Sequence, residues 1–363
     1  MNNNSVIVEV YENTAKNVSK YVHASGAETT IKTVSSCSNT IDSEGLRIQL
    51  QDRNKVALFV SSSVGCEMRC GFCYLTAKKF PFFSLSDSDI IENSLAALRK
   101  KVEEDPTVRN KYLKLSYMGM GDAFASSNNE FGYTAYTIVT TALQEGLVAG
   151  LDGIDIGTSF PKGELGWTRD QIEWLDHYIW EVGVKSGAIK LNPQQEYRYG
   201  SKEVDNGRTP VRLFISLHTM NSSTRKTLMP AAGSIRDIVK YVQLLDIDVI
   251  FHVMFLNTIN DYIDDVDGLI YTFEHDPVFS NYELRVLRFN ACKGSKYKEA
   301  VSTENIINFW LSKAKIKFKY QVSAGSEIKA ACGQFLCRDV RSNGIGTLDG
   351  DTHVELESGI SRD

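Results

Sequence analysis

The sequence lacks the features that would place the protein in a membrane, outside the cell or broadly on nucleic acid. No apolar run in its 363 residues approaches the length of a membrane span. Its first residues, Met1 to Ser5, contain neither the basic region nor the apolar core of an export signal. A net charge of −5 excludes attraction of nucleic acid by the whole surface, so any RNA contact needs a local basic patch. We therefore expect a cytoplasmic protein with no membrane partner.

The composition is that of a chain able to bury a sizeable core. Hydrophobic residues make up 42% and charged residues 23%, as in globular proteins. A length of 363 residues is ordinary for a single α/β barrel. Seven cysteines, three of them in one loop, fit a reducing compartment better than a secreted disulfide scaffold.

Three cysteines stand close together in a Cys-x3-Cys-x2-Cys spacing. Cys66, Cys70 and Cys73 follow the β-prone run 56–60, and such a thiol-rich loop favours a soft metal centre. Four-iron clusters normally take four cysteines, so three would leave one iron open to a small molecule. Structural zinc is the alternative, but it needs four ligands and no second half of a zinc site lies nearby. A disulfide framework fits less well, because three clustered cysteines cannot all pair with one another.

Apolar runs alternate with amphipathic stretches from residue 55 onward. The expected strands cover residues 55–60, 112–117, 152–157, 211–217, 248–256 and 283–289. The expected helices cover residues 87–102, 134–147, 235–245 and 261–273, with N-caps at Ser86 and Asn260. The apolar strands suit parallel pairing with both faces covered. Six βα units in succession predict an α/β fold, a partial (β/α)6 barrel with its active site at the carboxyl ends of the strands.

Three segments lie outside this alternation. Residues 1–54 predict a small β-rich extension before a barrel of residues 55–337. Residues 163–209 predict an insertion at the barrel rim, which either touches substrate or is a solvated excursion. Residues 338–363 predict a mobile tail. Lysines stand at every second residue from 313 to 319. They would either keep an exposed sheet edge from pairing with another strand or form a stripe that contacts phosphates.

A glycine-rich stretch closes the second expected strand. Gly119, Gly121 and Asp122 end the run 117–122, where glycines let the backbone approach a ligand closely. The neighbouring carboxylate can accept a hydrogen bond from an amine or a ribose hydroxyl. Taken alone, the stretch is explained equally well by an ordinary turn.

The cysteine spacing, with Phe72 just before the last cysteine, resembles that of the radical S-adenosylmethionine (SAM) enzymes. In that family the three thiolates carry a [4Fe-4S] cluster, and the open iron chelates the amino and carboxylate groups of SAM. An electron from the cluster cleaves SAM to a 5′-deoxyadenosyl radical. The resemblance implies a [4Fe-4S] cluster and SAM as cofactors.

The wider chain resembles one subfamily, the RNA adenine C2/C8 methyltransferases of the RlmN/Cfr family. The resemblance runs from about residue 56 to residue 336. Its motifs, in the family's order, are residues 61–66, 119–122, 215–218, 253–256, 288–290 and 325–334. Residues 119–122 are similar to the family's Gly-Met-Gly-Glu SAM motif, with Asp122 in place of Glu. Residues 325–334 are similar to the segment that carries a methylated cysteine.

The resemblance implies roles for individual residues. Cys66, Cys70 and Cys73 would bind the cluster. The residues that would contact SAM are Phe72, Gly121, Asp122, Gly157, Ser216, His218 and Asn290. Cys332 would accept a methyl group from one SAM, and a radical made from a second SAM would abstract hydrogen from that methyl. The resulting carbon radical would add to adenine, whose amidine carbon is not nucleophilic enough for ordinary methyl transfer. Without this context Cys332 would be interpreted as a small buried residue.

The chain departs from the family pattern in three places. Phe59 occupies the position of a second catalytic cysteine, whose thiol in the family releases the RNA product by forming a disulfide. The family's N-terminal helical RNA-binding domain is missing, and Gly157 replaces a serine that contacts SAM. The family's candidate proton acceptor lies in the strand pair before the cluster, and Glu44 is its nearest match in the sequence.

These observations leave three hypotheses. The first is a radical SAM enzyme that methylates an adenine carbon in RNA (rRNA or tRNA), with an electron donor such as flavodoxin or ferredoxin. The second is a radical SAM enzyme that acts on another substrate or on SAM itself. The third is an inactive RNA- or protein-binding homologue, which the intact cluster cysteines disfavour because exposed thiols are prone to oxidation.

Overall fold

A computed structural model provides the fold. It describes residues 5–33, 40–41, 47–48, 54–125, 130–163, 165–193, 210–291, 295–301, 303–307, 316, 318–321, 325–331, 333–336, 338–339 and 346–347. Two predicted catalytic residues, Glu44 and Cys332, lie outside the described residues.

One large sheet organises the molecule, and its strand order is β1-β2-β3-β6-β9-β10-β11-β12-β13-β14. The strands are β1 Ile7–Glu12, β2 Val18–His23, β3 Glu28–Lys32, β6 Lys55–Phe59, β9 Tyr112–Tyr117, β10 Gly150–Thr158, β11 Val211–Ser216, β12 Asp248–Val253, β13 Glu283–Leu287 and β14 Phe318–Gln321. From β6 to β14 every neighbouring pair is parallel. β1 and β14 end the order without pairing to each other, so the predicted partial barrel is confirmed as an open sheet.

Three short strand pairs accompany the large sheet. They are β4 Thr40–Ile41 with β5 Arg47–Ile48, β7 Ser63–Val64 with β8 Phe83–Ser84, and β15 Arg338–Asp339 with β16 Gly346–Thr347. The pair β7–β8 brackets the cysteine loop in sequence and joins the two sides of that loop.

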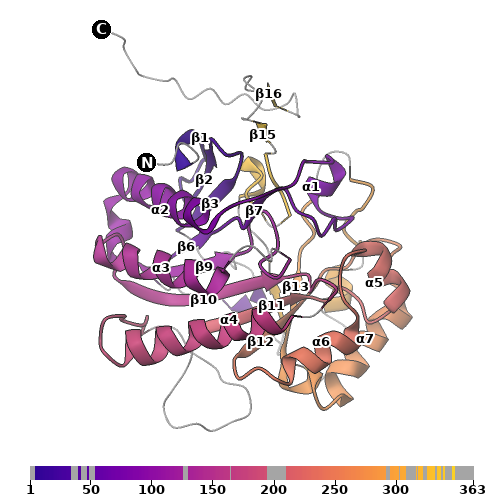
Figure 1. Cartoon of the computed structure of the whole chain (residues 1–363). Coiled ribbons are helices and arrows are strands. Elements are labelled where there is room, and N and C mark those ends of the chain that lie inside the picture. The colour runs from indigo at the N-terminus through magenta and orange to yellow at the C-terminus, as the bar shows by residue number, and fades with distance from the viewer. Residues whose placement is uncertain are drawn as a thin grey trace.

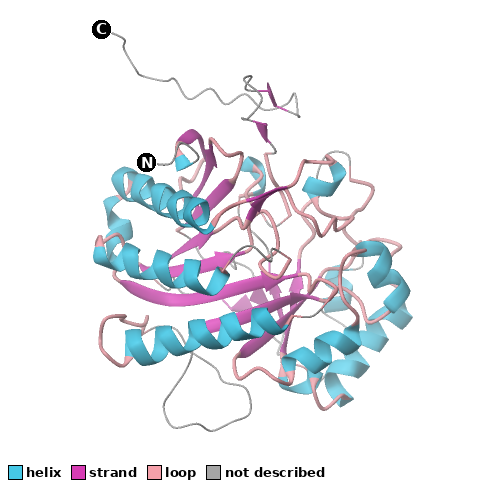
Figure 2. Cartoon of the chain, in the orientation of Figure 1, coloured by secondary structure: helices cyan, strands magenta, loops and turns pink. Residues whose placement is uncertain are grey.

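Helices cover one side of the large sheet (Figure 2). The α-helices are α1 Tyr74–Ala77, α2 Asp87–Glu104, α3 Phe131–Gln144, α4 Gly166–His177, α5 Ser222–Leu228, α6 Ile235–Val242, α7 Ile263–His275 and α8 Thr303–Asn305. Three 3-10 helices, Pro106–Asn110, Phe279–Asn281 and Ser326–Ile328, and a π-helix, Tyr178–Val184, complete the set. In Figure 1, α2, α3 and α4 lie one below another, while α5, α6 and α7 gather at the lower right. Within the described residues no helix is long and apolar enough to cross a membrane.

Alternation along the strands explains how the sheet is covered. Leu113 and Leu115 of β9 are fully buried in the main apolar core. Lys114 and Ser116 alternate with them and point to the opposite face. On that face Lys114 Nζ lies 2.5 Å from Asp155 Oδ2. The strands are parallel as predicted, and on β9 the face opposite the apolar core carries charged and polar side chains.

The N-terminal extension continues the sheet. β3 pairs antiparallel with β6, with Thr30 opposite Phe59. Every residue of β2 and β3 is buried, including Lys20 and Glu28. The extension is β-rich as predicted, and it joins the parallel strands edge to edge.

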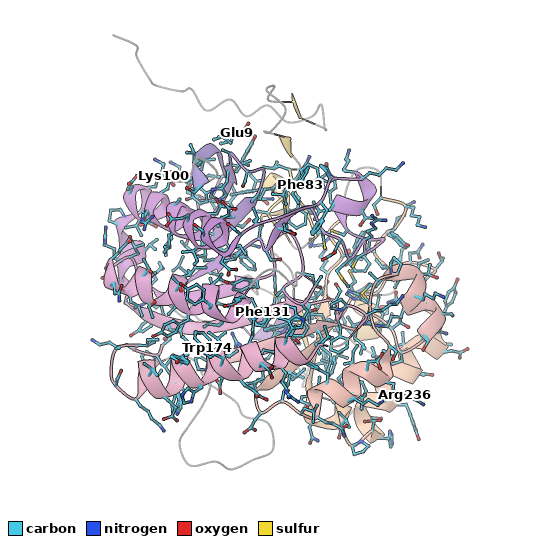
Figure 3. The ribbon with its side chains drawn as sticks, viewed as in Figure 1. Glu9, Phe83, Lys100, Phe131, Trp174 and Arg236 are labelled. Atoms are coloured by element: carbon cyan, nitrogen blue, oxygen red, sulfur yellow. The ribbon has the colours of Figure 1, made fainter. Side chains whose placement is uncertain are left out.

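Part of the predicted insertion has a regular place in the fold. α4 and the π-helix after it form the connection between the parallel strands β10 and β11. The ring of Trp174 in α4 contacts Tyr136 of α3, with ring centroids 5.8 Å apart. Phe131 and Trp174, labelled in Figure 3, mark this layer of α3 and α4. Residues 194–209 lie outside the described residues, and the domain boundaries at residues 54 and 337 stay a prediction.

Two expected helix starts have different outcomes. Ser86 caps α2 in a reciprocal capping box with Asp89, as predicted. α7 instead starts after Tyr262. Asn260 was predicted as its N-cap, and this is wrong because the Asn260 side chain binds backbone groups of neighbouring loops.

The lysine-rich strand lies at the sheet edge. β14 is the last strand in the order, and Lys319 Nζ lies 2.8 Å from Glu283 Oε2 on β13. This contact supports the interpretation of edge lysines for Lys319. Lys315 and Lys317 lie outside the described residues.

Candidate active site

The cysteine loop follows β6 at the carboxyl edge of the parallel strands. Gly65 introduces it with a φ of +73°, and a Cβ there would lie 2.2 Å from the carbonyl oxygen of Pro81. Cys66, Cys70 and Cys73 form no disulfide and all line one cavity of about 160 Å³. The loop therefore presents three thiols to the same space.

The thiols suit an iron–sulfur cluster. Burial raises the pKa of Cys66 well above its ordinary value, and Asp122, Cys73 and Cys70 raise it further, so the Cys66 sulfur lies within electrostatic range of the other two. Burial also raises the pKa of Cys70 to about 11. Among the described residues no three Cys, His, Asp or Glu side chains are arranged to hold a single metal ion. A cluster of several irons accepts more widely spaced sulfur donors, and the donor set fits it.

The same cavity gathers every residue predicted to contact SAM. They are Phe72, Gly121, Asp122, Gly157, Ser216, His218 and Asn290. These residues come from the cysteine loop and from the carboxyl ends of β9, β10, β11 and β13, as expected for a parallel α/β sheet. The structure brings the predicted set together, while the contact of each residue with SAM stays a prediction.

Gly121 occupies a place that has no room for a side chain. Its φ is +93°, and a Cβ would lie 2.3 Å from Ser62 Oγ and 2.4 Å from Ser63 Oγ. Its backbone therefore lies directly against the serines that lead into the cysteine loop. Gly157 is similarly crowded, because a Cβ there would lie 2.7 Å from Met118 Cγ.

The Asp122 carboxylate organises the end of β10. Its Oδ1 accepts a hydrogen bond from Thr158 Oγ1 at 2.8 Å, and its Oδ2 accepts one from the Ser159 backbone N–H at 2.6 Å. Burial raises the pKa of Asp122, while these donors and the Phe124 N–H lower it. Asp122 thus fixes the cavity wall with both carboxylate oxygens already engaged.

His218 stands after β11 in the left-handed backbone region, with a φ of 59°. Its ring meets Phe72 edge to face, with centroids 4.8 Å apart. Asn260 holds the loop by donating from its amide to the carbonyl oxygens of His218 at 2.6 Å and Met254 at 2.9 Å. Burial and the nearby Arg225 lower the pKa of His218 to about 3, so the ring is neutral. Its Nδ1 has no hydrogen-bond partner within the described residues.

Arg225 is a site residue to which sequence reasoning gave no role. Its buried guanidinium donates to the carbonyl oxygens of Ser216 at 2.9 Å, Leu217 at 2.7 Å and Gly233 at 3.1 Å. Burial lowers its pKa to about 10, and the Cys70 thiol acts in the opposite direction. Arg225 therefore fastens the end of β11 and puts a positive charge near the cysteine loop. The available signal was a basic residue seven positions after the motif at residues 215–218.

A second cavity lies beside the first. It is lined by Phe59 together with Ala330, Ala331, Gly333 and Gln334, which flank residue 332 on both sides. Lys32 Nζ stands 5.1 Å from the centre of the Phe59 ring, a cation–π contact. Phe59, predicted to occupy the position of the family's second catalytic cysteine, therefore lines the same cavity as residues on both sides of Cys332 in sequence.

A buried ion pair holds that segment. Lys20 Nζ lies 2.6 Å from Glu28 Oε2, and both side chains are nearly fully buried. Lys20 also donates to the carbonyl oxygens of Lys329 and Gln334, and Glu28 Oε1 accepts from the Leu336 N–H at 2.8 Å. The pair therefore binds backbone groups before and after residue 332.

Glu28 is a carboxylate at the wall of the second cavity. β3 is the antiparallel partner of β6, and Glu28 begins β3 and lines that cavity. β3 was not expected as a strand, because its polar residues lack the apolar alternation that marks a half-buried strand. Glu44, the predicted proton acceptor, lies outside the described residues, so its role stays a prediction.

The structure combines an open parallel α/β sheet, three cavity-facing cysteines after the first parallel strand and a glycine-lined cavity beside them. This combination defines the radical SAM class of fold and site. No family model matches the chain. A dual-specificity RNA methyltransferase RlmN from Campylobacter jejuni subsp. jejuni is 30% identical over 302 residues, which are 81% of this chain and 70% of that protein. The RlmN of Campylobacter hominis is 30% identical over 77% of this chain and 66% of its own length. The chain thus spans about two thirds of the length of these relatives.

The chain belongs to the RlmN family of radical SAM RNA methyltransferases. Its fold is also similar to that of a radical SAM methyltransferase from Sphaerobacter thermophilus, with a TM-score of 0.60 and 19% identity. That similarity covers 92% of this chain and 81% of the other, and it confirms the fold class. Membership of the family implies a [4Fe-4S] cluster and SAM as cofactors.

Proposed function

We propose that this protein binds a [4Fe-4S] cluster through Cys66, Cys70 and Cys73 and cleaves SAM. We propose further that it methylates an adenine carbon in rRNA or tRNA through an S-methylcysteine at Cys332. A flavodoxin or ferredoxin would donate the electrons, and the cytoplasm is the compartment that suits its thiols.

One observation carries this proposal. The cavity that holds the three cysteines also holds every residue expected to contact SAM, and Gly333 and Phe335, close after Cys332 in sequence, line the same cavity. A cofactor bound there would stand next to the segment that accepts the methyl group. The geometry therefore supports the use of SAM in one cavity both as the methyl donor and as the source of the radical.

The chain's own residues would prepare this space. A bound cluster would supply the electron that cleaves SAM. Because Gly121 has no side chain, its backbone packs directly against Ser62 and Ser63 at the wall of this cavity. Neutral His218 can hydrogen-bond without bringing a charge, and the ring of Phe72 limits its rotation. Arg225 supplies positive charge beside thiolates that would otherwise be buried with little compensation.

Phe59 supports a second candidate, a radical SAM enzyme that acts on a substrate other than RNA. The Phe59 side chain lines the cavity next to the 330–335 segment and cannot form a disulfide. Release of a product attached to Cys332 would then need another thiol, and Cys337, Cys37 and Cys292 lie outside the described residues. A reaction that needs no release step would avoid this requirement.

Anaerobic turnover distinguishes the candidates. Protein reconstituted with iron and sulfide is incubated with SAM, a strong reductant and unmodified bulk RNA. The proposal predicts 5′-deoxyadenosine, S-adenosylhomocysteine and methyladenosine together, and a Cys70→Ala variant should form no 5′-deoxyadenosine. The finding of 5′-deoxyadenosine without methylated RNA would favour the second candidate. The absence of 5′-deoxyadenosine from the wild type would contradict both.

A further inference from the structure

His252 of β12 has a buried ring nitrogen without a partner. The side chain is 9% exposed, and its Nε2 makes no hydrogen bond within the described residues. Ser216, a predicted SAM contact, lies directly opposite it in the parallel register of β11 and β12. Its ring packs against Phe214, with centroids 5.0 Å apart. The ring is therefore held in place while one of its polar atoms is left open.

Its position is at the junction of the two cavities. The residues that line both cavities are Met118, Gly119, His252, Leu287, Gly333 and Phe335. Among them His252 alone has a side chain with strong hydrogen-bonding groups. His218, in contrast, lines only the SAM cavity. His252 thus faces the space between the expected SAM site and the segment on either side of residue 332.

The buried Nε2 without a hydrogen-bond partner destabilises the folded protein unless a ligand binds it. An unsatisfied buried polar group destabilises the folded state, and native proteins contain few of them. His23 shows the usual arrangement, since its buried ring binds Thr29 Oγ1 at 2.9 Å and approaches the carbonyl oxygen of Ser5 at 3.4 Å. Burial, Arg285 and His218 together lower the pKa of His252 well below its ordinary value. The ring is therefore neutral and offers one donor and one acceptor.

We propose that His252 Nε2 hydrogen-bonds the edge of the adenine that is to be methylated and holds its ring at the junction of the two cavities. This inference rests on the proposed function. A substrate base at the junction would lie between SAM and the methyl-carrying segment, as methyl addition requires. A neutral imidazole suits an adenine edge, which presents both an amino donor and ring-nitrogen acceptors.

The test separates base positioning from SAM chemistry. His252→Ala and His252→Gln are assayed anaerobically with SAM and unmodified bulk RNA, and 5′-deoxyadenosine and methyladenosine are both quantified. We expect His252→Ala to lose about tenfold or more in methyladenosine per 5′-deoxyadenosine, since one hydrogen bond is removed. His252→Gln should recover part of this loss, and the control His23→Gln should keep the wild-type ratio. A wild-type ratio in His252→Ala, or an equal fall of both products, would overturn the proposal.

A second measurement needs no turnover. His252→Phe should keep or raise the melting temperature, because replacing an unpartnered polar group by an apolar one of similar shape removes a penalty. His23→Phe should lower it, because two partners lose their hydrogen bonds. A loss in His252→Phe as large as that in His23→Phe would show that Nε2 has a protein partner, which overturns the proposal. If the wild type forms no methyladenosine, the proposed function is wrong. The assignment of His252 to adenine is then overturned as well, whatever the melting temperatures show.

Discussion

At the scale of single residues, Gly121 most directly links the backbone to the cofactor site. A Gly121→Ala variant should bind SAM at least tenfold more weakly, because the new Cβ would lie 2.3 Å from Ser62 Oγ and force the cavity wall to move. Equilibrium dialysis of reconstituted protein with labelled SAM measures this loss. Gly163→Ala is the control, since Gly163 also has a positive φ, +120°, but nothing lies within 4 Å of its Cβ position. Equal SAM affinity in Gly121→Ala and wild type would contradict the site.

Phe59 makes a prediction about product release. If the missing thiol limits release, the wild type should form no more than a single methylated RNA per protein molecule, and Phe59→Cys should form several. Phe59→Ala is the matched control, because it loses the same cation–π contact with Lys32 without supplying a thiol. Product per protein is counted in anaerobic assays. Multiple turnovers by the wild type would show that another group releases the product.

At the scale of elements, the β2–β3 hairpin holds the segment around residue 332. A Lys20→Met variant leaves the Glu28 carboxylate buried without its counter-charge, which should cost about 3–5 kcal/mol of stability. Hydrogen exchange should speed up at the Leu336 amide, which donates to Glu28 Oε1.

A surface lysine provides the comparison for this hairpin variant. Lys100, labelled in Figure 3, is 44% exposed and lies 3.6 Å from Glu104. Lys100→Met should change stability by less than about 1 kcal/mol, because exposed ion pairs contribute little. Unchanged exchange at Leu336 in Lys20→Met would show that the ion pair does not hold the segment.

Helix α4 contains a carboxyl group that makes stability depend on pH. Burial raises the pKa of Asp176 to about 7, and Asp246 adds to the shift. Because the folded state binds this proton more tightly than the unfolded state, the associated stability is present at low pH and is lost as pH rises through about 7. Asp176→Asn should therefore raise the melting temperature at pH 8, by on the order of 2 °C, and raise it by less at pH 5. The same shift at both pH values would show that Asp176 is not protonated in the folded state.

The sequence predicted the elements whose side chains follow a simple pattern. The apolar runs at residues 55–60 and 112–117 became β6 and β9, and Ser86 capped α2 as expected. β2 and β3 were missed because buried polar residues such as Lys20 and Glu28 hide a strand from any hydrophobic pattern. Their burial is stabilised by long-range partners at Lys329 and Leu336, which no local signal in the chain reveals.

The candidate site was predictable to a different degree. Spacing singled out the three cysteines, motif order singled out the predicted SAM contacts, and the structure brings both sets together in the first cavity. The carbonyl contacts of Arg225 and the position of His252 in the lining of both cavities are properties of the folded chain, so only the structure could describe them. Glu44, the predicted proton acceptor, lies outside the described residues and stays a prediction, while strand pairing places Glu28 at the wall of the second cavity.

At the scale of the whole molecule, an open sheet gives one enzyme two adjoining cavities. Helices cover one side of the sheet (Figure 2), and side chains at the carboxyl ends of the parallel strands line the two cavities. The antiparallel extension adds the wall of the second cavity with Glu28, Thr30 and Lys32. The central claim can be tested as chemistry on one side chain, because the proposed function requires SAM bound in the first cavity to deliver a methyl group to Cys332.

The most direct measurement is the mass of the peptide that contains Cys332. Protein reconstituted with iron and sulfide is incubated anaerobically with SAM and reductant in the absence of RNA, digested and analysed by mass spectrometry. We predict that the peptide gains the mass of one methyl group in place of a hydrogen, and that a Cys332→Ser variant gains none. An unmodified Cys332 in protein that forms 5′-deoxyadenosine under the same conditions would contradict the account.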